Sequence, residues 1–274
     1  MSYATLMVYA NIDHVSKALI GVAAGLTDKF SAKLIGLSAL AITPPSVAEG
    51  VVIVDNASEF DIAEMKTKLA DAENDFRAAA GADRQIEWRS FLEFPTETLI
   101  SEARCADLIV VEKSRALRDI HRFVDNGSAI LGAGRPFLVV PAAVKTLTAD
   151  HVVVGWKDTR EARRAIQDAL PFLHEAKRAT IVEICEKDQM ETAHLRVADV
   201  VSYLAGHRIK AEARVETQLL GSSGADQIIG LALDDGADLL VIGAYGHSRL
   251  NEWVFGGMTR DLLMSSPICC LMSH

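Results

Sequence analysis

The chain lacks an excess of positive charge. Among its 274 residues, Lys and Arg together number 28, whereas Asp and Glu number 37, so the formal net charge at pH 7 is -9. A protein that binds nucleic acid or an anionic membrane generally needs a basic field that attracts phosphate groups. The acidic balance argues against both kinds of partner, and only a local anion site remains compatible with it.

Cysteine is scarce. None of the 4 cysteines lies in a Cys-x-x-Cys spacing, so neither a zinc site nor a redox pair is predicted. Each cysteine lies in or beside an apolar run, which is typical of inert buried thiols. These cysteines are Cys105, Cys185, Cys269 and Cys270.

No membrane span or export signal is expected. The longest uncharged stretch, Leu34 to Ala48, is too short to cross a membrane and contains Pro44 and Pro45. The N-terminus has no basic segment of the kind that begins a signal peptide. Few cysteines suit a reducing compartment, and we therefore expect a soluble, cytoplasmic protein.

Enzyme signatures are absent as well. The sequence contains no G-x-S-x-G elbow, Walker A loop, H-E-x-x-H pair or kinase motif, and its 8 histidines are scattered. Hydrolysis of ATP needs a placed base and usually a metal ligand, and no residue is nominated for either role. We expect no catalytic residue and no intrinsic metal site.

What the sequence does contain is an internal repeat. The segment Ala106–Val111 returns as Ala237–Ile242, which lies 131 positions later, and several downstream residues keep this offset. The pairs are Ser128 with Thr259, Leu131 with Leu262, and Pro136 with Pro267. Such conserved spacing indicates duplication. It predicts two domains, residues 1–144 and 150–274, with the boundary between Pro141 and His151.

Each copy predicts an α/β fold. Short β-branched runs alternate with longer amphipathic segments, such as residues 16–30 and 161–173, which is typical of βαβ units with a parallel sheet. Residues 108–111 and 239–242 are apolar at every position, as expected for strands buried on both faces by helices. We expect about five strands per copy, the last at Phe137–Val140 and Ile268–Leu271.

A glycine-rich segment follows the second of these buried strands. Gly243 and Gly246 come first, and after nine residues Gly256 and Gly257 precede a predicted helix that contains Thr259. Glycine allows a backbone to approach a ligand closely, and the free N–H groups of a helix start can bind phosphate. Ligands of such sheets bind beyond the carboxyl ends of the strands. An anion site is therefore one interpretation. The other is that these glycines only end a strand and precede a helix, as is common without a ligand.

The spacing Gly243-x2-Gly246-x9-Gly256 resembles the ATP-binding pattern G-x2-G-x9-G-[S/T] of the universal stress protein family. The residues 236–242 before it and Ser266-Pro267-Ile268 after it are also similar to that family. The resemblance implies an adenine-nucleotide α-hydrolase-like fold with strand order 3-2-1-4-5 in each half. It also implies that the halves pair through their final strands like the family's dimer, with a further homodimer left open.

The resemblance further implies that the C-terminal half binds ATP in a stress response, with Mg²⁺ entering only with the nucleotide. Two positions depart from the family pattern, because Gly257 replaces the closing hydroxyl residue and Lys157 stands where the family has an acid. Asp158, one residue later, is either a ribose contact or the N-cap of the next helix. By the same resemblance Ile184 contacts adenine, although core packing is the alternative. His247, beside Gly246, is either a phosphate contact or an exposed loop residue.

The first copy has lost this loop. At the same offset, the four glycine positions hold Glu112, Arg115, Asp125 and Asn126. Carboxylates repel phosphate, and side chains prevent close backbone approach, so we expect no nucleotide in the N-terminal half. A basic group near this loop is either a solvated helix face or a site for a different anion. It comprises Lys113, Arg115, Arg118, His121 and Arg122.

Three functions therefore compete. The first is a stress-response module that binds an adenine nucleotide, and the second is a nucleotide-free scaffold that acts through protein contacts. The third is an enzyme for a small anionic metabolite. The three spaced glycines favour the first function, whereas Gly257 and Lys157 favour the second. The insertion from Pro44 to Phe60 is predicted to be a surface loop, with a cover over the first crevice as the alternative.

Overall fold

A computed structural model describes residues 2–42, 47–48, 51–52, 59–81, 84–113, 119–246 and 257–274. The first half contains β1 (Thr5–Tyr9), α1 (Lys17–Phe30), β2 (Lys33–Ala39), α2 (Glu59–Ala80), β5 (Ile86–Phe91), α3 (Pro95–Glu102), β6 (Leu108–Glu112), α4 (Asn126–Ala133) and β7 (Phe137–Val140). The second half contains β8 (His151–Gly155), α5 (Arg160–Glu175), β9 (Arg178–Cys185), α6 (Met190–Gly206), β10 (Glu212–Thr217), α7 (Gly224–Asp234), β11 (Leu239–Gly243), α9 (Gly257–Ser265) and β12 (Cys269–Ser273). Two short strands, β3 (Val47–Ala48) and β4 (Val51–Val52), form a separate antiparallel pair within the Pro44 to Phe60 insertion.

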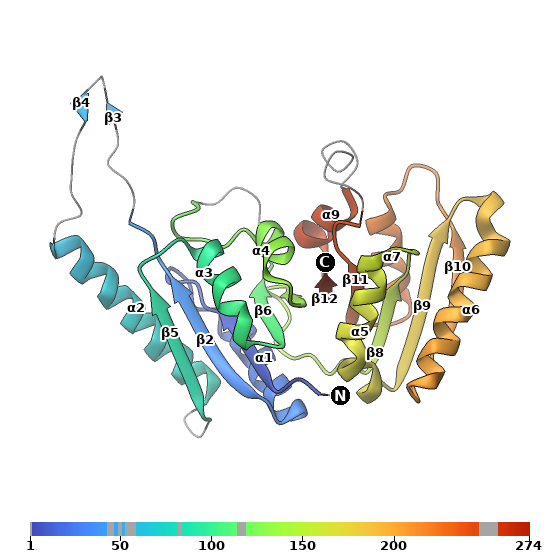
Figure 1. Ribbon diagram of the computed structural model, residues 1–274, viewed down its shortest axis with the longest axis horizontal. Coiled ribbons are helices and arrows are strands. Elements are labelled where there is room, and N and C mark those ends of the chain that lie inside the picture. The colour runs from blue at the N-terminus through green and yellow to red at the C-terminus, as the bar shows by residue number, and fades with distance from the viewer. Residues whose placement is uncertain are drawn as a thin grey trace.

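The two halves share one ten-stranded sheet (Figure 1). Its order is β10-β9-β8-β11-β12-β7-β6-β1-β2-β5, which is 3-2-1-4-5 within each half, and this confirms the predicted topology. The strands are parallel within each half, whereas β12 and β7 pair antiparallel, with Leu271 opposite Leu138. The sequence predicted two sheets, and in the structure they are joined edge to edge through their final strands.

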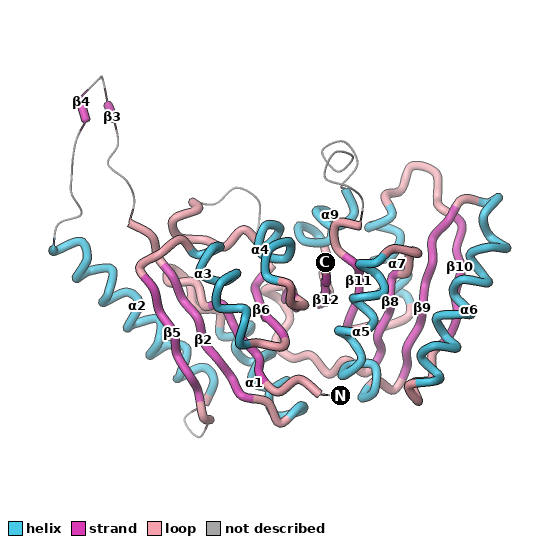
Figure 2. The backbone as a smooth tube through the Cα atoms, viewed as in Figure 1, coloured by secondary structure: helices cyan, strands magenta, loops and turns pink. Residues whose placement is uncertain are grey.

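Helices cover both faces of the sheet (Figure 2). Buried side chains of α1, α2, α5 and α6 form one core cluster, and those of α3, α4, α7 and α9 form the other. The central strands β6 and β11 are almost fully buried from Leu108 to Val111 and from Leu239 to Ile242. These strands contact helices on both sides, which explains why they are apolar at every position.

The last strand begins later than the sequence suggested. Ile268 precedes β12, which begins at Cys269, because the Ser266 hydroxyl donates to the Ile268 carbonyl at 2.9 Å and forms a turn there. Cys185, Cys269 and Cys270 are buried, and burial raises the pKa of Cys269 to about 12 and that of Cys270 to about 11. The expectation of inert buried thiols holds for these three, whereas Cys105 is only partly buried.

Three aromatic rings extend the contact between the halves beyond the paired strands. Tyr3 and Phe30 belong to the first half and Phe172 to the second, and their ring centroids lie 5.1 to 5.5 Å apart in edge-on arrangements. The Tyr3 hydroxyl also donates a hydrogen bond to the Asp168 carbonyl on α5. Such a cluster buries a large apolar area, so the halves are held by side chains as well as by the sheet.

The Asp168 carboxylate at this junction is poorly stabilised. Its Oδ2 atom is buried and has no hydrogen-bond partner among the described residues, and Arg164 Nε lies 3.6 Å away. Burial raises the pKa of Asp168, and this effect exceeds the lowering by Ser273 and Arg164. A raised pKa means that the group stabilises the fold at low pH and that this contribution is lost as the pH rises through the folded-state pKa.

Replacing Asp168 by Asn should therefore stabilise the protein at neutral pH. We expect the free energy of unfolding at pH 7 to rise by about 1 kcal/mol, because the buried ionised group is removed. The gain should shrink as the pH approaches 4, where the native carboxyl is increasingly protonated. Urea unfolding of both proteins across this pH range measures the effect, and an equal stability at pH 7 would contradict it.

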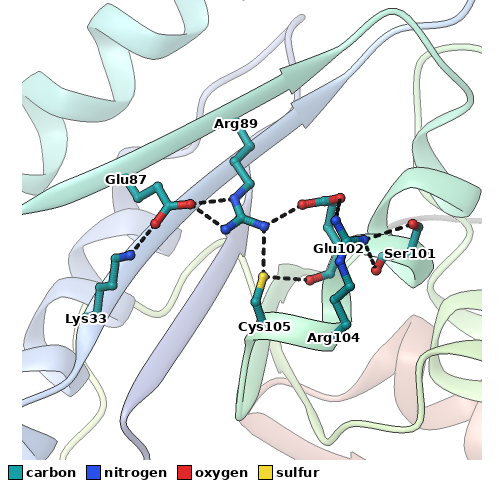
Figure 3. A network of polar contacts seen from close by, with 7 residues as sticks. All are labelled: Lys33, Glu87, Arg89, Ser101, Glu102, Arg104 and Cys105. Atoms are coloured by element: carbon teal, nitrogen blue, oxygen red, sulfur yellow. Dashed lines mark hydrogen bonds and ion pairs between the residues drawn. The ribbon is translucent and has the colours of Figure 1, made fainter.

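The outer edge of the first half carries a network of charges (Figure 3). Arg89 on the edge strand β5 donates to Glu87 and to the buried Glu102, each at 2.6 Å, and its Nη1 atom also lies 2.8 Å from the Cys105 sulfur. Lys33 pairs with Glu87 from the neighbouring strand. Charged side chains on an edge strand discourage pairing with another chain, so this network protects one free edge of the sheet.

Within the described part of the chain, no helix combines the length and the apolar character needed to cross a membrane.

Candidate functional site

The predicted site lies where β8, β9 and β11 end at the same edge of the sheet. Gly243 is the last residue of β11, and the Ala244 N–H group after it donates to the Ser273 carbonyl of β12 at 2.8 Å. The chain then turns through Tyr245 to Gly246. We call residues 243–246 the glycine turn. Two predicted site residues, His247 and Gly256, lie outside the described residues.

Gly243 is needed for packing within its own half. A Cβ atom at this position would lie 2.5 Å from the Ala162 backbone nitrogen and 2.6 Å from the Glu161 carbonyl carbon. The end of β11 therefore lies directly against the first turn of α5. The sequence suggested that this glycine admits a ligand, but the geometry gives it a structural reason that applies whether or not a ligand is bound.

The two ends of the glycine-rich segment are hydrogen-bonded to each other. Helix α9 begins at Gly257, which places Thr259 in its first turn, and the Thr259 Oγ1 atom accepts a hydrogen bond from the Tyr245 N–H group at 3.2 Å. Tyr245 has a φ of 56°, a left-handed conformation that is uncommon for a residue with a side chain. The bond holds the glycine turn against the start of α9.

A buried carboxylate stands between the glycine turn and α5. Glu161 is only 3% exposed, and an added Cβ at Gly246 would lie 3.2 Å from its Oε2 atom. Burial raises the pKa of Glu161, but hydrogen bonds from Arg160, its own N–H group and the Thr159 hydroxyl outweigh this effect and lower the pKa. The positive end of α5 is thus already balanced by an internal anion.

Sequence reasoning missed Glu161. The available signal was an acidic residue in the first turn of a predicted helix, which is common on protein surfaces. Its importance comes from burial beside Gly246, and that contact depends on the fold. A phosphate at the start of α5 would therefore face this carboxylate.

Asp158 and Ile184 lie on the neighbouring strand ends. Thr159 is the N-cap of α5, because its hydroxyl accepts from the Ala162 N–H group at 3.3 Å, so the N-cap alternative for Asp158 is wrong. The half-exposed Asp158 carboxylate forms an ion pair with Arg163 instead. Ile184 is partly buried and packs against the core cluster that contains side chains of α7. Ribose and adenine contacts for these two residues stay predictions.

The first half has a small cavity at the equivalent place. It lies between the starts of α1 and α4, has a volume of about 50 Å³, and is lined in part by Asn11, Glu112, Lys113 and Asn126. This volume holds one or two water molecules. The Asn126 side chain donates to the Glu112 carbonyl at 3.0 Å, and Lys113 Nζ donates to the Ser266 carbonyl of the other half at 2.9 Å. Residues that align with the glycines of the second half, or lie beside them, thus make hydrogen bonds within the protein.

The three described residues of the predicted basic group each have a partner of their own. Arg122 pairs with Asp13, and His121 packs against Phe94 with ring centroids 5.0 Å apart. Both residues are partly exposed and lie in a turn rather than on a helix, so the expected helix face is wrong for these two, and the anion alternative stays a prediction. Arg115 and Arg118 lie outside the described residues. No group of three or more His, Cys, Asp or Glu residues able to hold a metal ion occurs in the described ranges.

The fold and the glycine turn together define a class of protein. A parallel 3-2-1-4-5 sheet covered by helices on both faces, with a glycine turn after its fourth strand, is an α/β protein of the adenine-nucleotide α-hydrolase-like type. The family model described as "Universal stress protein family" matches residues 148–274. The C-terminal half of the chain thus carries a universal stress protein domain.

One protein is similar to this chain in sequence, and solved structures are similar to it in fold. A universal stress protein of Synechocystis sp. is 28% identical over 142 residues, which are 49% of this chain and 45% of that protein. The match thus spans about half the length of this curated relative. A universal stress protein structure from Archaeoglobus fulgidus covers 98% of this chain and 95% of its own, with 12% identity and a TM-score of 0.67. A structure of a putative universal stress protein from Pseudomonas aeruginosa covers 99% and 93%, with 13% identity and a TM-score of 0.60.

Proposed function

We propose that the protein is a non-catalytic, cytoplasmic binding module whose C-terminal half binds ATP or a related adenine nucleotide in a stress response. The observation that carries this proposal is the Tyr245–Thr259 hydrogen bond of 3.2 Å. It holds the glycine turn and the first turn of α9 together beyond the carboxyl end of β11, where open α/β sheets bind their ligands. The backbone N–H groups that begin α9 are then available to phosphate oxygens.

The proposed contacts follow from these positions. The N–H groups at Gly257 and beyond, with the Thr259 hydroxyl, bind phosphate, and Gly246 keeps the approach free of a side chain. Asp158 binds the ribose and Ile184 contacts the adenine. His247 and Gly256 belong to the same proposed loop. Mg²⁺ enters only with the nucleotide, and no residue of the chain is assigned to catalysis.

A scaffold without nucleotide is the second candidate, and Glu161 favours it. Its buried carboxylate lies beside Gly246 and repels phosphate oxygens that approach from the side of α5. Under this function the glycine turn serves only the packing of β11 against α5, and the joined halves present surfaces to a protein partner.

Replacing Gly246 by Val distinguishes the two candidates. The new side chain would stand over the glycine turn within reach of Glu161 and Thr159 side-chain atoms. We expect the affinity for ATP, measured by equilibrium dialysis with the full chain, to fall by about a hundredfold or more, which is about 2.7 kcal/mol. The fold should persist, because the atoms met by the new Cβ belong to side chains that can move.

A matched control is Gly25→Val on α1, where an added Cβ has no atom within 4 Å. This variant should bind ATP like the unmodified protein. If Gly246→Val binds ATP as well as Gly25→Val does, the nucleotide does not occupy the glycine turn and the scaffold function is favoured.

A further inference from the structure

The glycine turn is in contact with the other half of the chain. The Tyr245 hydroxyl reaches across the junction to Gly127 in the first turn of α4, where an added Cβ would lie 2.6 Å from Tyr245 Oη and 3.7 Å from Cζ. Helices α4 and α9 lie against each other at the centre of the molecule (Figure 1). Only a residue without a side chain at position 127 leaves room for the tyrosine.

The backbone of Tyr245 is constrained at the same time. Its left-handed φ of 56° is disfavoured for a residue with a Cβ atom, so neighbouring contacts must maintain it. One of these contacts is the N–H bond to Thr259. Another involves the last residue of the described chain, because His274 Nδ1 lies 3.0 Å from the Ala244 carbonyl and its ring packs edge-on to Tyr245 at 6.5 Å.

The start of α4 is itself fixed by the residues that replaced the first glycine loop. Asp125 caps α4 by accepting from the Gly127 N–H group at 3.1 Å, and the Asn126 side chain donates to the Glu112 carbonyl at 3.0 Å. Lys113, the next residue along the chain, donates across the junction to Ser266 at 2.9 Å. The described residues at both ends of this segment are thus held by hydrogen bonds, and Lys113 bonds directly to the second half.

We infer that Tyr245 is a positioning residue through which the N-terminal half fixes the conformation of the C-terminal glycine turn. The first half has exchanged its own glycine loop for a surface with a gap at Gly127, and the tyrosine occupies this gap. Filling the gap displaces the Tyr245 ring and loosens the turn that borders the proposed ligand site. The effect on nucleotide affinity rests on the proposed function, whereas the effect on the turn does not.

A rescue experiment tests this inference. Gly127→Ala places a methyl group 2.6 Å from the Tyr245 hydroxyl oxygen, and adding Tyr245→Phe removes that oxygen and leaves the ring carbon at an ordinary 3.7 Å. In Gly127→Ala we expect amide hydrogen exchange at residues 243–246 to accelerate about fivefold or more, and exchange in the double variant to return toward that of Tyr245→Phe alone. Gly25→Ala, with open space around the new Cβ, should leave the exchange unchanged.

A second readout reports Tyr245 directly. The chain contains 4 tyrosines, so fluorotyrosine labelling gives four ¹⁹F resonances, and the one absent from Tyr245→Phe belongs to Tyr245. This resonance should shift in Gly127→Ala, and the affinity for ATP should fall about fivefold in Gly127→Ala and recover in the double variant. An unshifted resonance, or exchange that stays fast in the double variant, would overturn the inference. If the unmodified protein binds no ATP, the proposed function fails while the exchange and ¹⁹F results still decide the inference.

Discussion

Replacing Gly243 by Ala should destabilise the protein by about 3 kcal/mol. The added methyl group would lie 2.5 to 2.9 Å from three backbone atoms of Glu161 and Ala162 at the start of α5. Backbone atoms cannot move aside like a flexible side chain, so β11 and α5 must separate. Urea unfolding followed by circular dichroism measures the loss in the free energy of unfolding.

Gly155, at the end of the adjacent strand β8, provides a matched control. It lies opposite Ile242 in the register, and an added Cβ there meets side-chain atoms at 3.6 Å or more, an ordinary contact distance. Gly155→Ala should change stability by less than about 1 kcal/mol. If both variants lose the same stability, close packing of β11 on α5 does not explain the requirement for Gly243.

Truncating Phe172 to Ala should cost about 3 to 5 kcal/mol. Its side chain is fully buried, and it contacts Tyr3 and Phe30 of the first half. In this variant we further expect calorimetry to resolve separate unfolding transitions of the two halves, because the substitution removes the aromatic cluster that links their cores. Cooperative unfolding of such halves depends on the interface that they share.

Phe76→Ala is the control for this prediction. Phe76 is also fully buried, but it packs against Trp88 within the first half, with ring centroids 5.3 Å apart. This variant should lose a similar free energy of unfolding at a site remote from the junction. Its two halves should still unfold in one transition. A single unfolding transition in Phe172→Ala would show that the paired strands alone maintain cooperativity.

The fold was predictable because its signals are local. Consecutive apolar residues at 108–111 and 239–242 predict burial on both faces, and a repeat with a fixed offset predicts two halves of the same fold. Neither prediction requires knowledge of tertiary contacts. The capping of α5 was less certain, since Asp158 and Thr159 are both good caps, and the structure uses Thr159.

The site was only partly predictable. The spacing of Gly243 and Gly246 identified the turn after β11, but the glycines alone do not reveal what lies against them. Glu161 is distant in sequence from Gly246, and Gly127 lies in the other half from Tyr245, so both contacts exist only in the folded chain. The sequence likewise suggested a role for Gly243 in ligand approach, whereas its close contact is with the α5 backbone.

The halves therefore contribute different properties to one molecule. The second half retains the glycine turn, and the first half has side chains where that turn would be and uses them in structural bonds. Lys113 and the gap at Gly127 connect this altered surface to the second half. One continuous sheet thus carries a single candidate nucleotide site in its described residues.

The number of nucleotides bound per chain tests the central claim most directly. Isothermal titration of the full chain with ATP should give one site with a dissociation constant in the micromolar range, about 7 to 8 kcal/mol of binding free energy. Absence of binding at millimolar ATP, or two sites per chain, would contradict an account in which only the second half retains a phosphate-binding glycine turn.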